Sequence, residues 1–502
     1  MSPLYDVADI RAIERAAAAM LPPGALMQRA GQASANAALD LLPFATAHAK
    51  VLVLAGPGDN GGDALEAAAH LSYTGAQVTL IHFAPGATPS AERQAALERA
   101  KASDTRFRAL EDAAIAGTDW NLVIDGLFGI GLKRPLAGDY RALAEAVNQL
   151  RCSVLALDVP SGLDADSGSV IGGTDGIAIH ASHTITFIGN KPGLHTCDGR
   201  DYAGLVDIAR LDIDAALFPP ARLHLNDVKF FARQLRARRQ NSHKGSYGNV
   251  AVIGGADGMR GAPILAARSA LHSGAGRVYV LFPDQALAND PGQPELMCRQ
   301  AEGYDFSLAT LVIGPGLGDS DHARELLQRA IVCGSALVAD ADALNLLAAD
   351  PAQQSALAQR PAAVILTPHP LEAARLLNTS ISAVQADRLG AARTLAARLQ
   401  AIVVLKGSGT VIAAPNGDTV INSTGNPALA TAGTGDVLAG LSGALLAQGW
   451  PQWEAALAAV WLHGMAADVL VTDGHGPIGL TAGELIPAIR TALNRMVQHH
   501  VH

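Results

Sequence analysis

Residues 431–436 read Thr-Ala-Gly-Thr-Gly-Asp and combine features that suit the transfer of a phosphoryl group onto oxygen. Glycines let the backbone approach a ligand closely, and the first amides of the apolar helix predicted to follow are available to an anion. Asp436 stands at the start of that helix, where its carboxylate can accept a proton from a substrate hydroxyl. The alternative is an Asp that only caps a helix after a glycine-rich turn. We take Asp436 as a candidate catalytic residue of a site that works by positioning and charge stabilisation.

A second glycine-rich loop, at residues 56–63, follows an apolar strand and opens a helix. It has the spacing G-x-G-x-x-G of dinucleotide-binding loops. No acidic residue ends the next strand, Val78–Phe83, where such proteins bind a ribose hydroxyl. The pattern therefore argues against ordinary redox use of a dinucleotide. Asn60 and Asp63 are short oxygen carriers that can approach a phosphate or a cation.

Polar residues also end two further strands of the first half. Asp125 follows one apolar run, and Asp158 and Ser161 follow the next. Because the carboxyl ends of parallel strands form the ligand crevice of an open α/β sheet, Asn60, Asp125 and Ser161 can together hold a hard cation through oxygen. Asp158 is a candidate acid or base for a ligand bound beside them. Taken singly, each of these residues is equally explained as a turn or cap residue.

The second half repeats this organisation with different residues. Glycines or polar groups follow five of its predicted strands or precede its helices, at 254–262, 314–318, 340–344, 367–372 and 406–410. Each has a simpler explanation: a turn, a loop histidine at His369, or a hairpin with an exposed Lys406, since residues 410–412 are typical of a returning strand. Together they predict a cleft for a nucleotide and an acceptor. No Walker lysine motif is present, which excludes a P-loop kinase.

Apolar runs that alternate with Ala/Leu-rich helical patterns position all these residues, so we expect an α/β protein with parallel sheets. Length, at 502 residues, favours two domains. The prolines at 219–220 and the basic run from Arg233 to Arg239 place the boundary at 1–220 and 221–502. No sequence repeat links the halves, so we expect two different domains, with each strand followed by a helix.

Composition limits the partners. A net charge of −9 argues against nucleic acid or an anionic membrane surface. No uninterrupted apolar run reaches 18 residues, and no signal-peptide pattern starts the chain. Its 4 cysteines contain no Cys-x-x-Cys pair, so neither a zinc site nor a disulfide framework is indicated. We therefore expect a cytoplasmic protein.

The first half resembles the NAD(P)HX epimerases, which act on hydrated nicotinamide nucleotides, over about residues 5–215. The resemblance rests on Asn60–Asp63, on residues 158–164 (Asp-Val-Pro-Ser-Gly-Leu-Asp) and on residues 191–194 (Lys-Pro-Gly-Leu). Asp59 and Ala64 depart from the family pattern. The resemblance implies a Rossmann-like fold and a potassium ion held by Asn60, Asp125 and Ser161. It further implies that these residues contact the substrate: Asp59, Asn60, Gly61, Gly62, Asp63, Gly129, Ile130, Gly131, Leu132, Lys133, Arg134, Pro135 and Asp158.

The second half resembles the ribokinase-like superfamily, and within it the ADP-dependent NAD(P)HX dehydratases, over about residues 225–495. The features are residues 242–245, 340–344, 367–370 and 479–485. His369-Pro370-Leu371-Glu372 stands where sugar kinases carry Asn-x-x-Glu near magnesium. The resemblance implies ADP with Mg²⁺ as cofactors and a hydrated nucleotide bound by Ala262, Gly316, His369 and Asp436. It also implies that the adenine nucleotide contacts Lys406, Gly407, Ser408, Gly409, Thr410 and Gly435.

The resulting hypothesis is a repair enzyme with two active sites. One site interconverts the R and S epimers of NADHX and NADPHX, and the other uses ADP to dehydrate the S epimer, giving NAD(P)H, AMP and phosphate. The sequence leaves ATP open as the donor, and similar proteins assemble into homo-oligomers. Two alternatives remain at this point: a small-molecule kinase that releases a stable phosphoester, and a nucleotide-binding module without activity.

Overall fold

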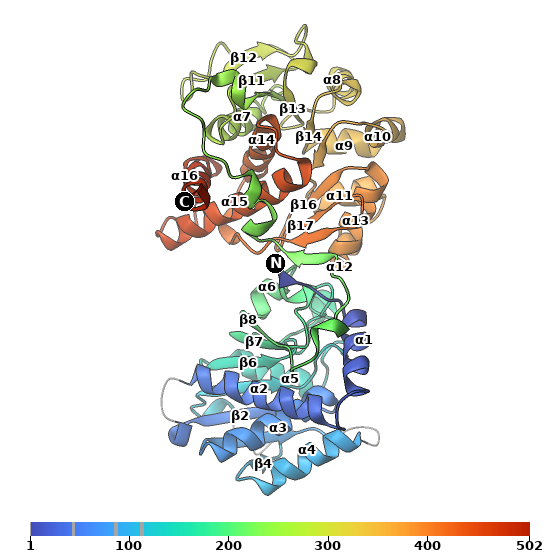
Figure 1. Ribbon diagram of the computed structural model, residues 1–502, viewed down its shortest axis with the longest axis vertical. Helices are drawn as coiled ribbons and strands as arrows, with labels where there is room; N and C mark the ends of the chain where they lie inside the picture. The colour runs from blue at the N-terminus through green and yellow to red at the C-terminus, as the bar shows by residue number, and fades with distance from the viewer. Residues whose placement is uncertain (1, 43–45, 85–88, 111–114, 502) are drawn as a thin grey trace. The chain divides into compact units, whose positions relative to one another are not determined.

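The computed structural model describes residues 2–42, 46–84, 89–110 and 115–501. Its internal contacts divide the chain into two compact units. The first runs from Pro3 to Ala221, and the second begins at Arg222 and also takes in Ser2. The sequence analysis had placed this division after residue 220. Figure 1 shows the helices and strands of each unit.

The first domain is built on a seven-stranded sheet with the order β4-β3-β2-β5-β6-β7-β8. Every neighbouring pair of strands is parallel. The strands are β2 (Lys50–Ala55), β3 (Gln77–His82), β4 (Arg106–Arg108), β5 (Leu122–Gly126), β6 (Ser153–Leu157), β7 (His183–Phe187) and β8 (Leu205–Ala209). The helices are α1 (Val7–Ala18), α2 (Ala25–Leu41), α3 (Asp59–Tyr73), α4 (Ala91–Ala102), α5 (Asp139–Asn148) and α6 (Gly199–Tyr202).

Alternate residues of β2 pack on opposite faces of this sheet. Val51 and Val53 belong to a core shared with α1 to α4, whereas Leu52 and Leu54 belong to a core shared with α5. Because successive side chains of a strand point to opposite faces, a strand covered on both sides is apolar throughout. The domain is therefore a three-layer, Rossmann-like sandwich, as the sequence predicted.

One expectation about the connections was wrong. No α-helix lies between β6 and β7, where the chain forms a long hydrogen-bonded loop with one 3-10 turn at Gly173–Asp175. Its amides bond within the loop, as Ile171 does to the Gly162 carbonyl at 2.9 Å. Gly162 has a φ of 103°, and a Cβ there would lie 2.2 Å from the Ile177 carbonyl oxygen. Glycine at this position lets the loop fold tightly without a helix.

The second domain contains an 11-stranded sheet with the order β1-β9-β18-β17-β16-β15-β14-β13-β10-β11-β12. The strands from β16 to β12 in this order are parallel, while β17 is antiparallel to both β16 and β18. The returning strand expected at residues 410–412 is confirmed as β17. The strands are β1 (Ser2–Pro3), β9 (Leu223–Leu225), β10 (Asn249–Ile253), β11 (Arg277–Phe282), β12 (Met297–Gln300), β13 (Thr310–Ile313), β14 (Leu337–Ala339), β15 (Val364–Leu366), β16 (Ile402–Leu405), β17 (Val411–Ala413) and β18 (Thr419–Ile421).

Helices cover both faces of this sheet, giving the ribokinase-like α/β/α sandwich that the sequence predicted. The largest core joins Val250 and Val252 of β10 to four helices: α7 (Gly261–His272), α14 (Thr434–Ala447), α15 (Gln452–Thr472) and α16 (Ala482–Val501). The remaining helices are α8 (Asp321–Val332), α9 (Asp342–Ala349), α10 (Pro351–Ala358), α11 (Pro370–Leu377), α12 (Ile381–Ala386) and α13 (Arg388–Leu399).

Helix α15 is long and apolar enough, by length and composition alone, to cross a membrane. Its most apolar window has a mean hydropathy of 1.6, and 61% of that window is buried inside the protein. Residues such as Ala455, Leu457 and Leu462 belong to the core around β10. Burial in that core accounts for the apolar character of α15.

Candidate active sites

The loops after β2, β5 and β6 meet at one edge of the first sheet because these three strands are neighbours. Gly56 donates its amide to the Gly126 carbonyl at 3.1 Å, joining the first two loops. A Cβ on Gly61 would lie 1.9 Å from the Gly56 carbonyl oxygen, so only glycine allows α3 to start this close to β2. The turn therefore brings Asp59 and Asn60, in the first turn of α3, to the strand edge.

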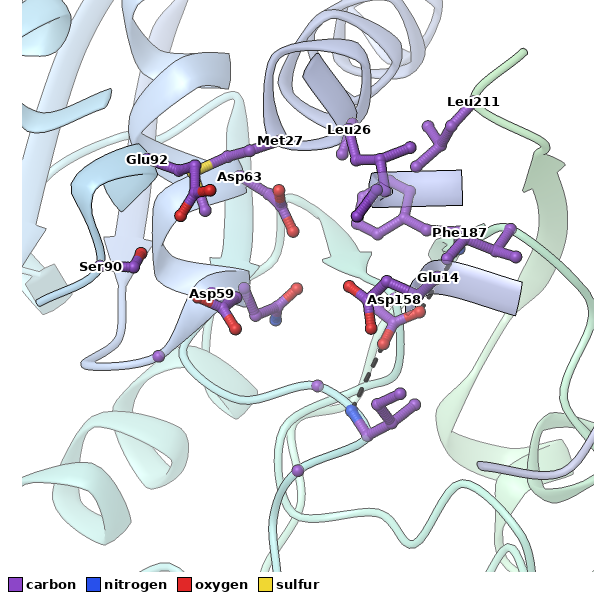
Figure 2. Close-up of a pocket in the computed structure, with 18 of the residues that line it drawn as sticks. Glu14, Leu26, Met27, Asp59, Asp63, Ser90, Glu92, Asp158, Phe187 and Leu211 are labelled. Atoms are coloured by element: carbon purple, nitrogen blue, oxygen red, sulfur yellow. Dashed lines mark hydrogen bonds between the residues drawn. The ribbon is translucent and has the colours of Figure 1, made fainter. Parts of the chain in front are cut away.

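A cavity of about 890 Å³ opens at this edge (Figure 2). Of the sequence-predicted substrate contacts, it is lined by Asp59, Asn60, Asp63, Gly129, Ile130, Gly131, Leu132 and Asp158. The remaining predicted contacts lie outside the lining: Gly61, Gly62, Lys133, Arg134 and Pro135. Sequence reasoning missed the other wall, which comes from α1 and the segment that leads into α2, residues 10–30.

Asp158 and Lys191 form a buried ion pair at the cavity wall. Lys191 Nζ lies 2.5 Å from Asp158 Oδ1, and the Lys191 side chain is completely buried. The ammonium also donates to Thr186 Oγ1 at 2.8 Å and to the Phe187 carbonyl at 2.7 Å. Asp158 Oδ2 accepts from the Ile130 amide at 3.3 Å, the bond drawn in Figure 2. The cation and the amide hold the Asp158 side chain in place at the cavity wall.

Asp158 adopts a backbone conformation with a φ of 66°, which is uncommon for a residue with a side chain. Its amide donates to the Ile185 carbonyl of β7 at 2.8 Å. Backbone strain of this kind persists where surrounding contacts enforce it, often at functional sites. The sequence had placed Lys191 in a family motif but gave it no role, because its partner is 33 residues away.

Asp63 and Glu14 are among the other carboxyl groups that line the cavity with Asp158. Figure 2 shows Asp63 of α3 and Glu14 of α1 turned toward the same space. Burial, followed by repulsion from Asp158 and Asp59, raises the pKa of Asp63 well above its usual range. Burial and the same two neighbours also raise the pKa of Glu14, against the attraction of Lys191 and Arg11. The cavity thus holds one carboxylate with a cationic partner and others whose charge is disfavoured.

Beside the cavity, Asp125 and Ser161 form a compact cluster of oxygen atoms. Ser161 donates through its hydroxyl to Asp125 Oδ1 at 2.7 Å and through its amide to Oδ2 at 2.8 Å. The Ser161 hydroxyl also lies 3.1 Å from the Phe128 carbonyl oxygen. Burial raises the pKa of Asp125 to about 6, although the bonds from Ser161 and Leu127 oppose this. Among the described residues, no cationic side chain is paired with Asp125.

Asn60 adds an oxygen without a partner. Its side-chain nitrogen donates to the Leu157 carbonyl at 3.1 Å, which fixes the orientation of the amide. Its Oδ1 is buried and accepts no hydrogen bond. A Cβ on Gly129 would lie 3.4 Å from Asn60 Cγ, and one on Gly126 would lie 3.1 Å from the Asn60 carbonyl. The Asn60 amide therefore lies against the loop that carries Asp125 and Phe128, as the sequence analysis expected for a cation site.

In the second domain, two carboxyl groups that follow neighbouring strands lie beside the ammonium of Lys406. Lys406 Nζ lies 2.7 Å from Asp340 Oδ1 and 4.0 Å from Glu372 Oε2. Asp340 and Glu372 raise the pKa of Lys406, against the effect of burial. Burial in turn raises the pKa of Glu372 to about 7. Because β14, β15 and β16 are neighbours, their carboxyl ends bring these residues together.

The loop before α14 lies next to this cluster. Gly433, with a φ of 88°, is the cap of α14, so the reading of Asp436 as the cap is wrong and Asp436 lies in the first turn. A Cβ on Gly435 would lie 3.3 Å from Lys406 Nζ and 3.7 Å from Asp340 Oδ2. Burial, followed by repulsion from Asp340, raises the pKa of Asp436 to about 7, while Lys406 lowers it. The free amides of α14 thus lie beside a cation and a carboxyl group that titrates near neutrality.

The other predicted contacts of this domain fall along the same edge. Gly316, with a φ of 57°, follows β13, and a Cβ there would lie 3.5 Å from Ala262 at the start of α7. His369 caps α11 by accepting amides through Nδ1, and its Nε2 lies 3.2 Å from Glu372 Oε1. Residues 406–410 connect β16 to β17, and the Lys406 amide bonds to the Pro368 carbonyl at 2.8 Å.

Two supporting residues escaped the sequence analysis. Arg388 is buried and donates to the carbonyls of Leu405 and Lys406, both at 3.3 Å, which holds the start of this loop. His463 of α15 is also buried, and burial lowers its pKa to about 4. Its Nε2 lies 2.9 Å from the Thr434 carbonyl, so this nitrogen carries the proton and donates. Neither residue lies in a recognisable motif, so only the fold reveals its position.

Known proteins match both halves of the chain. The family described as NAD(P)H-hydrate dehydratase matches residues 250–490, and the family described as YjeF-related protein N-terminus matches residues 23–193. The bifunctional NAD(P)H-hydrate repair enzyme Nnr of Coxiella burnetii is 38% identical over 98% of this chain and 100% of its own length. The Nnr of Escherichia coli is 35% identical over 98% of this chain and 94% of its own length.

Solved structures match the second domain. The Bacillus subtilis ADP/ATP-dependent NAD(P)H-hydrate dehydratase, co-crystallized with ATP/Mg²⁺, is 31% identical with a TM-score of 0.47, covering 54% of this chain and 98% of that chain. A ribokinase-like superfamily protein of Enterococcus faecalis is 27% identical with a TM-score of 0.48, covering 55% and 96%.

Proposed function

Because this chain belongs to the family of bifunctional NAD(P)H-hydrate repair enzymes, we propose that the two strand edges described above are its epimerase and dehydratase active sites. The N-terminal domain is the epimerase, and the C-terminal domain is the ADP/ATP-dependent dehydratase. The relatives match nearly the whole of this chain and of their own length, so both activities belong to one polypeptide.

In the epimerase, Asp158 is the proposed acid or base at the hydroxyl-bearing carbon of the nicotinamide ring. The observation that supports this is the ion pair with Lys191 at the cavity wall, which leaves Asp158 Oδ2 facing the cavity. A carboxylate held by a buried cation and an amide keeps its orientation while it exchanges a proton with a bound hydroxyl. Gly129–Leu132 line the cavity beside it, as do Asp59, Asn60 and Asp63 of α3.

A potassium ion held by Asn60, Asp125 and Ser161 is the second proposal for this domain. The buried, unpartnered Oδ1 of Asn60 and the buried carboxylate of Asp125 both lack a positive partner among the described residues. One carboxylate with neutral amide, hydroxyl and carbonyl oxygens is a weakly charged donor set that suits a monovalent ion better than a divalent one. Bound there, the ion would supply positive charge that holds the loops and offsets Asp125.

In the dehydratase, Asp436 is the proposed base for the hydroxyl of the S epimer. The position of Gly435, whose Cβ would contact Lys406 Nζ, carries this proposal because it places amides, cation and base in one site. As Asp436 accepts the proton, the substrate oxygen bonds to the terminal phosphorus of ADP, and the bond to AMP breaks. The carbon–oxygen bond then breaks, phosphate leaves, and loss of a ring proton restores the double bond. The amides of Gly433–Gly435 and Lys406 stabilise the charge on the transferred group.

For the donor, we propose ADP with Mg²⁺ bound near residues 406–410 and Gly435. The carboxylates of Asp340 and Glu372 and the ammonium of Lys406 make a charged pocket that suits a nucleotide with its cation. A bound Mg²⁺ would neutralise the donor phosphates. ATP remains the competing donor, and the two are compared directly in the test below.

Regeneration of NAD(P)H from mixed epimers tests both sites in the full chain, with ADP or ATP. Wild-type protein should recover both epimers, Asp436→Asn neither, and Asp158→Asn only the S epimer promptly. The exposed Asp473→Asn serves as a matched control and should behave as wild type. Failure to regenerate NAD(P)H with either donor, or accumulation of a stable phosphoester, would contradict the assignment and indicate a kinase.

A further inference from the structure

The α1 wall of the first-domain cavity carries a pair of arginines that no predicted contact explains. Arg11 and Arg15 both line the cavity, four residues apart on α1. Side chains at this spacing lie on the same face of a helix, about 5–6 Å apart at Cβ. Ile10, Ile13 and Ala17 of the same helix are buried in the core, which fixes the helix's rotation. The two guanidinium groups therefore project side by side along one wall.

Charges in the cavity are arranged unevenly. The lining contains 5 carboxyl groups and, as its basic side chains, Arg11 and Arg15. Lys191 does not contribute a free charge because it is buried and bonded to Asp158, Thr186 and Phe187. The predicted basic contacts Lys133 and Arg134 lie outside the lining. The positive charge available to a ligand in this cavity is thus concentrated on α1.

Neither arginine is engaged in holding the fold. Within the described part of the chain, the side chains of Arg11 and Arg15 form no hydrogen bond and no ion pair, although Arg11 acts on Glu14 through space. Other arginines of the domain are committed to structure. Arg93 donates to the carbonyls of Gly56 and Gly58, and Arg99 pairs with the buried Glu66.

The substrate of the epimerase is a dinucleotide with a bridging diphosphate, and in NADPHX it also has a 2′-phosphate. These groups are repelled by the Asp158 carboxylate, which lies beside the reacting ring. Planar guanidinium groups bind phosphate through paired hydrogen bonds. Resting on the function proposed above, we infer that Arg11 and Arg15 bind the phosphate groups of the dinucleotide substrate and so hold it in the epimerase cavity.

Binding to the diphosphate and binding to the 2′-phosphate predict different results, although α1 recognises a phosphate group in both cases. If the two arginines bind the diphosphate, their loss weakens the binding of NADHX and of NADPHX equally. If the two arginines bind the 2′-phosphate, their loss weakens the binding of NADPHX alone, and the pair determines which substrate is preferred. In both cases the contact is remote from the ring and is the same in ground and transition states, so KM should change while kcat does not.

The test is epimerisation of NADHX and of NADPHX by the full chain without ADP, so that the second domain is idle. Arg11→Ala/Arg15→Ala should raise KM at least about 10-fold for NADPHX, with kcat within about twofold, because each lost charge-assisted contact costs roughly that factor. Added salt should raise the wild-type KM and leave that of the variant nearly constant.

Arg151→Ala, an exposed arginine of the same domain outside the cavity, is the matched control and should leave KM unchanged. Thermal unfolding of all variants checks that the first domain is intact. An unchanged KM for both substrates in the double variant, or a fall in kcat alone, would overturn the inference while leaving the epimerase assignment in place. Absence of epimerisation by the wild-type protein would instead remove the proposed function.

Discussion

Lys406 donates to Asp340 at 2.7 Å, and its ammonium lies 3.3 Å from the position that a Cβ on Gly435 would take. The pair links β14 to β16 across β15, so the sheet order itself brings the cation to the start of α14. Asp340 holds the ammonium in place, and the same carboxylate raises the pKa of Asp436. One residue therefore orients the charge that would stabilise the phosphoryl group and adjusts the base that would accept the proton.

The pH dependence of dehydration should report this arrangement. Asp436 must be ionised to accept a proton, and its pKa of about 7 predicts that the rate falls as the pH drops through that value. In Asp340→Asn the repulsion that raises this pKa is gone, so the acidic limb should move to lower pH. The pH profile of kcat for both proteins is the measurement.

The exposed Asp473→Asn controls for the loss of one charge in the domain and should leave the limb in place. A lower rate at every pH in Asp340→Asn, without a shift of the limb, would show that Asp340 acts only on structure.

A double-variant cycle should separate stability from activity at Lys191. Removing the ammonium in Lys191→Met leaves the Asp158 carboxylate without its partner in a buried place, which should cost about 3 kcal/mol of unfolding free energy. Asp158→Asn/Lys191→Met removes both charges and should recover much of that loss. Neither protein should epimerise its substrate, since both lack the functional pair.

Calorimetry of the full chain, with the second-domain transition as internal reference, gives the stabilities. Equal destabilisation by the single and the double variant would contradict a coupled ion pair.

Much of the fold follows from the sequence because buried parallel strands are continuous apolar runs. On this ground the runs at residues 51–54, 249–253 and 402–405 predict strands, and β2, β10 and β16 confirm them. β7, with the sequence His-Thr-Ile-Thr-Phe, and the largely exposed β8 were not predicted, because polar residues interrupt them. The helix expected between β6 and β7 is absent because the chain there forms a glycine-containing loop that is held by its own hydrogen bonds.

The sites were predictable where motifs follow strands and unpredictable where distant elements meet. Asn60, Asp125 and Ser161 converge as expected because β2, β5 and β6 are neighbours. Strand order does not predict the α1 wall of the cavity, because the path of a helix that precedes β2 depends on tertiary packing. The same is true of His463, which reaches the Thr434 carbonyl from α15.

Asp63 should keep its proton to a higher pH than an ordinary aspartic acid. Burial and the neighbouring carboxyls raise its pKa, and the protonated side chain resembles an amide in charge and shape. Asp63→Asn should therefore keep KM for epimerisation within about threefold of wild type at the low end of the pH range in which the enzyme is active. As the pH rises through the raised pKa, wild-type Asp63 ionises and should repel the anionic substrate, whereas the variant should not. A large loss of affinity in Asp63→Asn at the low end of that range would show that a charged Asp63 is required.

Potassium should stabilise the first domain through the oxygen cluster. An ion that binds only the folded state raises the melting temperature, and the rise grows with the ion concentration. The first-domain transition should therefore rise in K⁺ more than in an equal concentration of Li⁺. Asp125→Asn removes the carboxylate and should abolish the difference between the two ions, while Asp201→Asn, on α6 and outside the cavity lining, should retain it. The same response in wild type and Asp125→Asn would place the ion elsewhere.

Gly435→Ala tests whether the start of α14 must remain open. Its added Cβ would lie 3.3 Å from Lys406 Nζ, tighter than an ordinary contact, and would occupy the space beside the free amides. Gly435 has no positive φ, so the helix itself tolerates alanine, and the fold should be retained. Dehydration should fall by about 100-fold, the usual loss when a group that stabilises transferred charge is displaced, while epimerisation by the first domain should continue.

Gly334→Ala is the matched control in the same domain, since a Cβ there has no neighbour within 4 Å and its φ is not positive. That variant should dehydrate its substrate at the wild-type rate. If Gly435→Ala also retained full dehydratase activity, the amides of α14 and Lys406 could not form the phosphoryl site, because a methyl group between them would exclude the transferred phosphate.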